Sequence, residues 1–170
     1  NLFFRQMKFS ISEENYIKSI YHLQVLHQRV NTTMLAESIH TKAASVTDML
    51  KKLSKKNIVD YTAYKSFVLT ESGNKIALDI IRKHRLWEYF LVNKLKFNWN
   101  EVHDIAEEME HINSKELIAR LDSYLEFPSF DPHGDPIPNN KGKMMELKQL
   151  NLTEISLKKT ATVSYIKDQS

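Results

Sequence analysis

The segment Met34–Lys56, MLAESIHTKAASVTDMLKKLSKK, decides the fold of the first part of the chain. It predicts a short helix capped by Thr33, a tight turn at His40–Lys42, and a second helix from Ala43 to about Lys56. In the second helix, apolar side chains recur at helical spacing, whereas the opposite face is small, polar and basic. This arrangement is typical of a helix-turn-helix.

The segments on either side extend the motif. Residues 12–28 carry apolar side chains at helical spacing and predict a helix with Ser12 as its N-cap. The runs 58–63 and 66–70 are rich in β-formers and alternate, so they predict a hairpin, or wing. The order of three helices followed directly by a hairpin predicts a winged helix-turn-helix DNA-binding domain. A small α+β domain that binds protein is the alternative, and the outward lysines favour DNA.

In the DNA-binding interpretation, the first turn of the 43–56 helix enters the major groove. The residues expected to meet base edges are Lys42, Ala44, Ser45, Thr47 and Asp48. The residues expected to meet phosphates are Lys51, Lys52 and Lys65.

A second stretch, Trp99–His111, WNEVHDIAEEMEH, carries imidazole and carboxylate groups at helical spacing. On a helix most of these groups converge on one face, where the carboxylates repel one another unless a cation lies between them. The converging residues are His103, Glu107, Glu110 and His111. A solvated acidic helix face is the alternative.

A long helix expected over residues 74–94 adds His84 and Glu88, four residues apart on one face. A surface hydrogen bond is the alternative for this pair. The chain has no cysteine, which excludes disulfides, thiolate metal sites and cysteine nucleophiles. A metal site must therefore use nitrogen and oxygen ligands, which suit divalent transition metals.

Composition indicates an ordinary globular protein of 170 residues, 42% of them hydrophobic and 26% charged. The first part of the chain is basic and the middle is acidic, which suggests that a polyanion and a cation are bound in different places. Apolar runs are short and broken by charges, so we expect no membrane association and a cytoplasmic location.

The remaining segments predict a further helix, a linker and a strand. Ser114 caps the helix KELIARLDSYLEF, and such apolar helices outside the DNA module are expected to form a dimer surface. Residues 127–140, FPSFDPHGDPIPNN, are rich in Pro and Gly and are interpreted as a linker. The run ATVSYI near the end predicts the start of a small β-barrel.

Together with the winged helix-turn-helix, the motifs RKHRLWE (residues 82–88), VHDIAEEMEH (102–111) and HGDPIP (133–138) resemble the diphtheria-toxin-repressor and manganese-transport-regulator family. The resemblance implies a mainly α fold with a winged helix-turn-helix over residues 7–72 and a helical metal-binding and dimerisation domain over 73–138. Residues 139–170 would then hold a linker and part of an SH3-like β-barrel. It also implies a homodimer.

Carried over by position, the resemblance implies two metal sites. His84, Glu88 and His103 match the ancillary site, and Glu107, Glu110 and His111 match the activating site. Glu107 stands where the iron-responsive branch has cysteine and the manganese branch has glutamate. We therefore expect Mn²⁺ or Fe²⁺ as effector, with other divalent transition metals substituting in vitro.

The first helix departs from the family pattern. Asn15 can still offer a carbonyl oxygen to a metal ion, whereas Lys18 stands where the manganese branch has a glutamate ligand and cannot itself be one.

The function expected from these features is a metal-activated dimeric repressor that binds double-stranded operator DNA and controls metal-ion uptake genes. We expect no enzyme, because the His/Glu cluster fits neither zinc-protease signature and the three glycines form no phosphate loop. Two alternatives remain: a metal-independent winged-helix regulator with a small organic effector, and a metal-dependent hydrolase.

Overall fold

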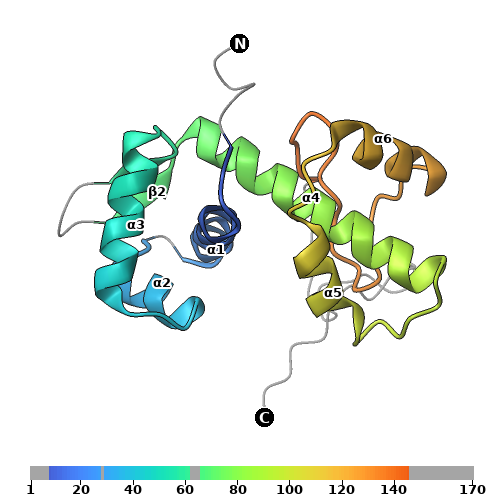
Figure 1. The fold of residues 1–170 in the computed structure, drawn as a ribbon, viewed down its shortest axis with the longest axis horizontal. Helices are drawn as coiled ribbons and strands as arrows, with labels where there is room; N and C mark the ends of the chain where they lie inside the picture. The colour runs from blue at the N-terminus through green and yellow to red at the C-terminus, as the bar shows by residue number, and fades with distance from the viewer. Residues whose placement is uncertain (1–7, 28, 62–65, 146–170) are drawn as a thin grey trace, which may run out of the picture. The chain divides into compact units, whose positions relative to one another are not determined.

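The computed structural model describes residues 8–27, 29–61 and 66–145. The expectation of a mainly helical chain that begins with a helix-turn-helix is confirmed, while Lys65 and the expected β-barrel segment lie outside the described residues. The described elements are α1 (Ile11–Leu26), α2 (Thr32–Ser38), α3 (Ala43–Lys55), β1 (Val59–Tyr61), β2 (Phe67–Leu69), α4 (Glu71–Asn93), α5 (Val102–Met109) and α6 (Lys115–Tyr124) (Figure 1).

The chain forms two compact units, Asn1–Ile81 and Arg82–Ser170, and each is described by itself. In the first unit, α1, α2 and α3 enclose a core that the wing completes. The wing pairs β1 with β2 antiparallel, with Val59 opposite Leu69 and Tyr61 opposite Phe67. The fully buried members of this core include Ile17, Ile20, Leu35, Val46, Leu50, Leu53 and Ile58.

Two helix starts differ from the sequence prediction. The N-cap of α1 is Ser10 instead of Ser12, because Ser10 forms a capping box with Glu13: each side chain accepts the other residue's backbone N–H. The N-cap of α2 is Asn31 instead of Thr33, since the Asn31 Oδ1 accepts the N–H of Met34. In both cases a cap two residues earlier extends the helix.

Helix α4 also begins earlier than the sequence predicts, at Glu71 instead of Asn74. Thr70 explains the difference, because its Oγ1 accepts the N–H of Gly73 and so caps the first turn. Gly73 lies against the wing, where a Cβ atom would lie 2.2 Å from the carbonyl oxygen of Ile58. Only glycine permits this close approach of two backbones.

In the second unit, the later turns of α4 pack against α5 and α6. The core of this unit comprises Leu86, Trp87, Leu91, Val102, Ala106, Leu121, Leu125 and Ile137. The cap of α6 is confirmed, because the Ser114 Oγ accepts the N–H of Leu117.

The helix expected for the Trp99–His111 stretch is shorter than predicted, since α5 covers only Val102–Met109. Residues 98–101 form a turn instead, in which the N–H of Glu101 donates to the carbonyl of Asn98 and the Glu101 carboxylate accepts the amide N–H groups of Asn98. Glu110 keeps a helical backbone as the C-cap. The helical face predicted for this stretch is therefore largely retained.

The interpretation of residues 127–140 as a linker is wrong. Phe130 and Pro136 form a β-bridge, the side chain of Ile137 is buried in the second core, and the Pro138 carbonyl accepts a hydrogen bond from Arg82 on α4. Proline and glycine give this segment the conformation of a folded loop. Its contact with α4 holds the loop in place. Among the described residues, no helix is long and apolar enough to cross a membrane.

Candidate metal centre

The centre begins with one turn of α4. His84 and Glu88 are four residues apart, so they lie on the same helical face, and both are buried. The Nε2 of His84 lies 3.1 Å from the Oε1 of Glu88. A buried carboxylate needs a charged or hydrogen-bonding partner, and here an imidazole supplies it.

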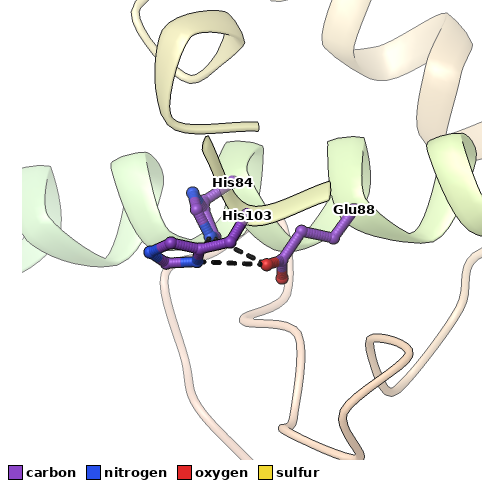
Figure 2. Close-up of side chains that lie close together, drawn as sticks. All are labelled: His84, Glu88 and His103. Atoms are coloured by element: carbon purple, nitrogen blue, oxygen red, sulfur yellow. Dashed lines mark hydrogen bonds and ion pairs between the residues drawn. The ribbon is translucent and has the colours of Figure 1, made fainter. Parts of the chain in front are cut away.

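Helix α5 adds His103 to this pair (Figure 2). Its Nδ1 lies 3.2 Å from the His84 Nε2 and 3.4 Å from the Glu88 Oε1. One donor atom from each of these three residues lies within 4.8 Å of the other two. Two imidazoles and a carboxylate are a donor set that fits a divalent transition-metal ion.

A second group of side chains continues from His84. The Nδ1 of His84 lies 2.7 Å from the Oε2 of Glu110, which is fully buried, and the Nε2 of His111 lies 3.8 Å from the other Glu110 oxygen. On the outer side, the Nε2 of His103 lies 3.6 Å from the Oε2 of Glu107. The six expected ligands from α4 and the α5 region thus form one connected cluster. Their role as metal ligands stays a prediction.

The carboxylates change the protonation of His84. Burial opposes a charged imidazole, but the hydrogen bonds and negative charges of Glu110 and Glu88 outweigh it and raise the pKa of His84 to about 9. Burial would raise the pKa of Glu88, yet the hydrogen bond and charge of His84, helped by His133, lower it overall. At neutral pH the metal-free cluster therefore holds a proton on His84.

One residue of this site was missed by the sequence prediction. The Nε2 of His133 lies 3.6 Å from the Oε1 of Glu88, so the nitrogens of three histidines surround one carboxylate oxygen. The ring of His133 also meets Trp99 edge-on, with 5.4 Å between ring centroids. The signal for it is the histidine of the HGDPIP motif, which lies outside the helical spacings that predict the other ligands.

Asn15, the expected ligand from the first helix, lies on α1 in the first unit. Its Oδ1 atom is buried and has no hydrogen-bond partner among the described residues. An oxygen donor is therefore available at this position, and its role in metal binding stays a prediction.

The candidate DNA-contacting residues on α3 differ in their surroundings. Most are exposed, as expected, but the hydroxyl of half-buried Thr47 donates to the Ala43 carbonyl within the helix. Asp48 lies 3.5 Å from Lys51, and the ammonium of Lys52 lies 3.4 Å from Glu13 on α1. The exposed members are Lys42, Ala44, Ser45, Asp48, Lys51 and Lys52.

Comparison with known proteins gives two family matches that together cover most of the chain. Residues 8–67 match the family model described as the iron dependent repressor, N-terminal DNA binding domain. Residues 70–139 match the model described as the iron dependent repressor, metal binding and dimerisation domain. The second match contains the whole cluster around Glu88.

Individual relatives and structures agree with these matches. The regulator MntR of Oceanobacillus iheyensis is 36% identical over 110 residues, which cover 65% of this chain and 74% of MntR. The iron-dependent repressor IdeR of Mycobacterium tuberculosis is 30% identical over 125 residues, which cover 74% of this chain and 54% of IdeR.

A solved structure titled as a manganese-dependent transcriptional repressor in complex with manganese is also similar. Its TM-score is 0.73 at 43% identity, over 80% of this chain and 63% of that one. The chain thus spans about half the length of IdeR and less than two thirds of the manganese repressor.

Proposed function

Because the chain belongs to the iron-dependent repressor family, which includes the diphtheria toxin repressor and MntR, we propose that it is a metal-activated repressor. As a homodimer in the cytoplasm, it binds operator DNA and controls genes for metal uptake, without enzymatic activity. The observation that carries this proposal is the convergence of His84, Glu88 and His103 beside the buried Glu110.

We assign Mn²⁺ or Fe²⁺ as the effector. The donors are imidazole nitrogens and carboxylate oxygens, and the described cluster offers no thiolate, which softer ions prefer. His133 is proposed as an additional donor, because its Nε2 faces the same Glu88 oxygen as the other two histidines. Asn15 is proposed to contribute its orphaned amide oxygen.

The residues of the cluster perform the sensing step. A bound ion supplies positive charge that offsets the carboxylates. In the metal-free protein, the proton on His84 offsets the charges of Glu88 and Glu110. Ligands from α4 and the α5 region are therefore held together more firmly in the loaded protein.

Helix α4 connects this cluster to the DNA-reading unit along the chain. It contributes Ala77 to the first core and Leu86 to the second. Fixing the ligands on α4 thus biases the conformations available to the dimer, whose two α3 helices must reach half-sites about 34 Å apart. Coupling of this kind typically changes DNA affinity by about 5- to 150-fold.

On α3, we propose the exposed start of the helix as the base-reading surface. Lys42, Ala44, Ser45, Thr47 and Asp48 are assigned to base edges. Lys51, Lys52 and Lys65 are assigned to phosphates.

An anaerobic titration tests the function. The affinity of the full chain for an operator fragment is measured at increasing Mn²⁺ or Fe²⁺, beside Glu88→Gln and the control Glu116→Gln, whose carboxylate is exposed on α6. We expect stimulation in the wild type and the control but not in Glu88→Gln. If the DNA affinity of the wild type changes with neither ion, the proposal is refuted.

A further inference from the structure

The folded loop of residues 129–138 is tied to α4 by two arginines that lie beside the metal cluster. Arg82 donates to the Pro138 carbonyl at the end of the loop and to Asp122 on α6. Arg85 donates to the Pro136 carbonyl at 2.5 Å. Both arginines lie on the same α4 segment as His84, so the loop and the cluster are both attached to this part of α4.

Arg85 also faces the acidic groups on both sides of His133. Its Nε lies 3.5 Å from Asp131, and its Nη2 lies 3.5 Å from Asp135. The Asp131 side chain in turn accepts the backbone N–H groups of His133 and Asp135, at 2.8 and 2.9 Å. A single guanidinium thus holds the residues whose hydrogen bonds shape the turn around His133.

Charge adds a reason why the loop needs this arginine. Asp131 is buried, so its carboxylate needs a partner of opposite charge. Arg85 provides that positive charge. Without Arg85, the Asp131 carboxylate would lose its ion-pair partner on α4, and the loop would lose the hydrogen bond from α4 to the Pro136 carbonyl.

We propose that Arg85 is a positioning residue of the metal centre, which fixes the 129–138 loop so that His133 is held beside Glu88 as a donor. This inference rests on the proposed function. Arg85 acts through His133, because among the described residues its polar contacts are with the 129–138 loop and Met144 and not with His84, Glu88 or His103. Partners that orient metal ligands typically change metal affinity by about 10- to 100-fold.

A double-mutant cycle separates positioning from general stabilisation. Mn²⁺ affinity is measured by calorimetry for the wild type, Arg85→Ala, His133→Ala and the double variant, with Arg120→Ala as control because Arg120 is exposed in an ion pair with Glu116 on α6. We expect Arg85→Ala to weaken binding about tenfold. The double variant should equal His133→Ala.

A full additional loss from Arg85→Ala in the His133→Ala background would overturn the proposal, as would unchanged affinity in Arg85→Ala alone. Arg85→Lys keeps the charge but cannot reach the loop with a planar fork, so it should bind Mn²⁺ with intermediate affinity. This variant decides the question if Arg85→Ala fails to fold.

Hydrogen exchange of the metal-free protein provides a readout that needs no ion. In Arg85→Lys and Arg85→Ala, amides of residues 129–138 should exchange faster, while those of α6 should not change. Equal exchange in wild type and variants would refute the role in fixing the loop. If the wild type and Arg120→Ala bind no Mn²⁺, the proposed function is wrong. Hydrogen exchange of residues 129–138 then still tests whether the loop depends on Arg85.

Discussion

The ammonium of Lys56, just after α3, lies 2.6 Å from the Oε1 of Glu13 in the first turn of α1. Glu13 is almost completely buried, and its other oxygen accepts the N–H of Ser10. This ion pair joins the start of one helix to the end of the DNA-reading helix. It sets the relation between α1 and α3 inside the first unit.

Glu13→Gln should destabilise the protein. It removes the charge from a buried group with two lysine partners, so we expect a loss of about 1–3 kcal/mol in the free energy of unfolding at pH 7. The matched control Glu71→Gln breaks an exposed pair with Lys75 and should leave stability nearly unchanged. Urea denaturation measures both.

The effect of Glu13→Gln should depend on pH. Burial alone would raise the pKa of Glu13, but the hydrogen bond and charge of Lys56 lower it overall below 4.5. A depressed pKa contributes stability that is present above the unfolded value and is lost as pH falls through the folded value. The two proteins should therefore converge in stability in acid. A difference that stays constant down to acid pH would contradict this account.

Gly73→Ala should also destabilise the first unit. The new Cβ would meet the backbone oxygen of Ile58 at 2.2 Å, and a backbone atom cannot rotate away as a side chain can. We expect a loss of about 1–3 kcal/mol by thermal or urea unfolding, although alanine is the better helix former. Ser72→Ala, at the neighbouring half-buried position, is the control and should be nearly neutral.

Metal affinity should depend on the predicted ligands. Glu88→Gln keeps the size of the side chain but removes its charge, and His103→Ala removes one imidazole. Each should weaken Mn²⁺ binding by at least about tenfold in calorimetry, since each removes a proposed ligand outright. Glu116→Gln should bind as the wild type does. Normal affinity in Glu88→Gln would mean that the ion binds elsewhere.

Metal binding should release a proton. His84 has a pKa of about 9 in the metal-free protein, so it is protonated at neutral pH, and an ion on its nitrogen must displace that proton. From this group alone, affinity should rise about tenfold per pH unit up to pH 9 and level off above it. Calorimetry in buffers of different ionisation enthalpy counts the protons, and no release near pH 7 would contradict the assignment.

The same shift has the opposite effect on the stability of the metal-free protein. A raised histidine pKa contributes stability that is fully present below 6.5, the ordinary value, and is lost as pH rises through about 9. Unfolding of the metal-free wild type should therefore become easier between these values. In His84→Ala this part of the pH dependence should be missing.

Lys51→Ala should weaken DNA binding through charge. Because exposed Lys51 is assigned to a phosphate, its loss should reduce the slope of log affinity against log salt by about 0.9. Lys75→Ala on α4, paired with exposed Glu71, is the control and should leave the slope unchanged. An unchanged slope in Lys51→Ala would show that this lysine does not contact a phosphate.

Much of the fold followed from local pattern. The 3.6-residue period places the helices, and alternation places the wing, because each signal is contained in a short window. The errors occurred at helix ends, where one side chain decides: Asn31 and Thr70 cap earlier than the apolar pattern begins. Such ends depend on a single hydrogen bond, which periodicity does not register.

The candidate site was predictable only in part. Spacing alone joined His84 to Glu88 and His103 to Glu107, because these pairs lie one helical turn apart. That His133 reaches Glu88 depends on the folded loop and on Arg85, which meet across a long stretch of sequence. No local window contains both partners, so the local pattern of this segment, which is rich in proline and glycine, predicts only a linker.

The ligand side chains are graded in exposure, from 61% for His103 and 41% for Glu107 to 3% for Glu88 and none for Glu110. His103 and Glu107 would therefore meet a hydrated ion first, whereas Glu88 and Glu110 would accept only an ion that has lost part of its water. Because Mg²⁺ dehydrates reluctantly, carboxylates this deeply enclosed would favour Mn²⁺ or Fe²⁺ over Mg²⁺.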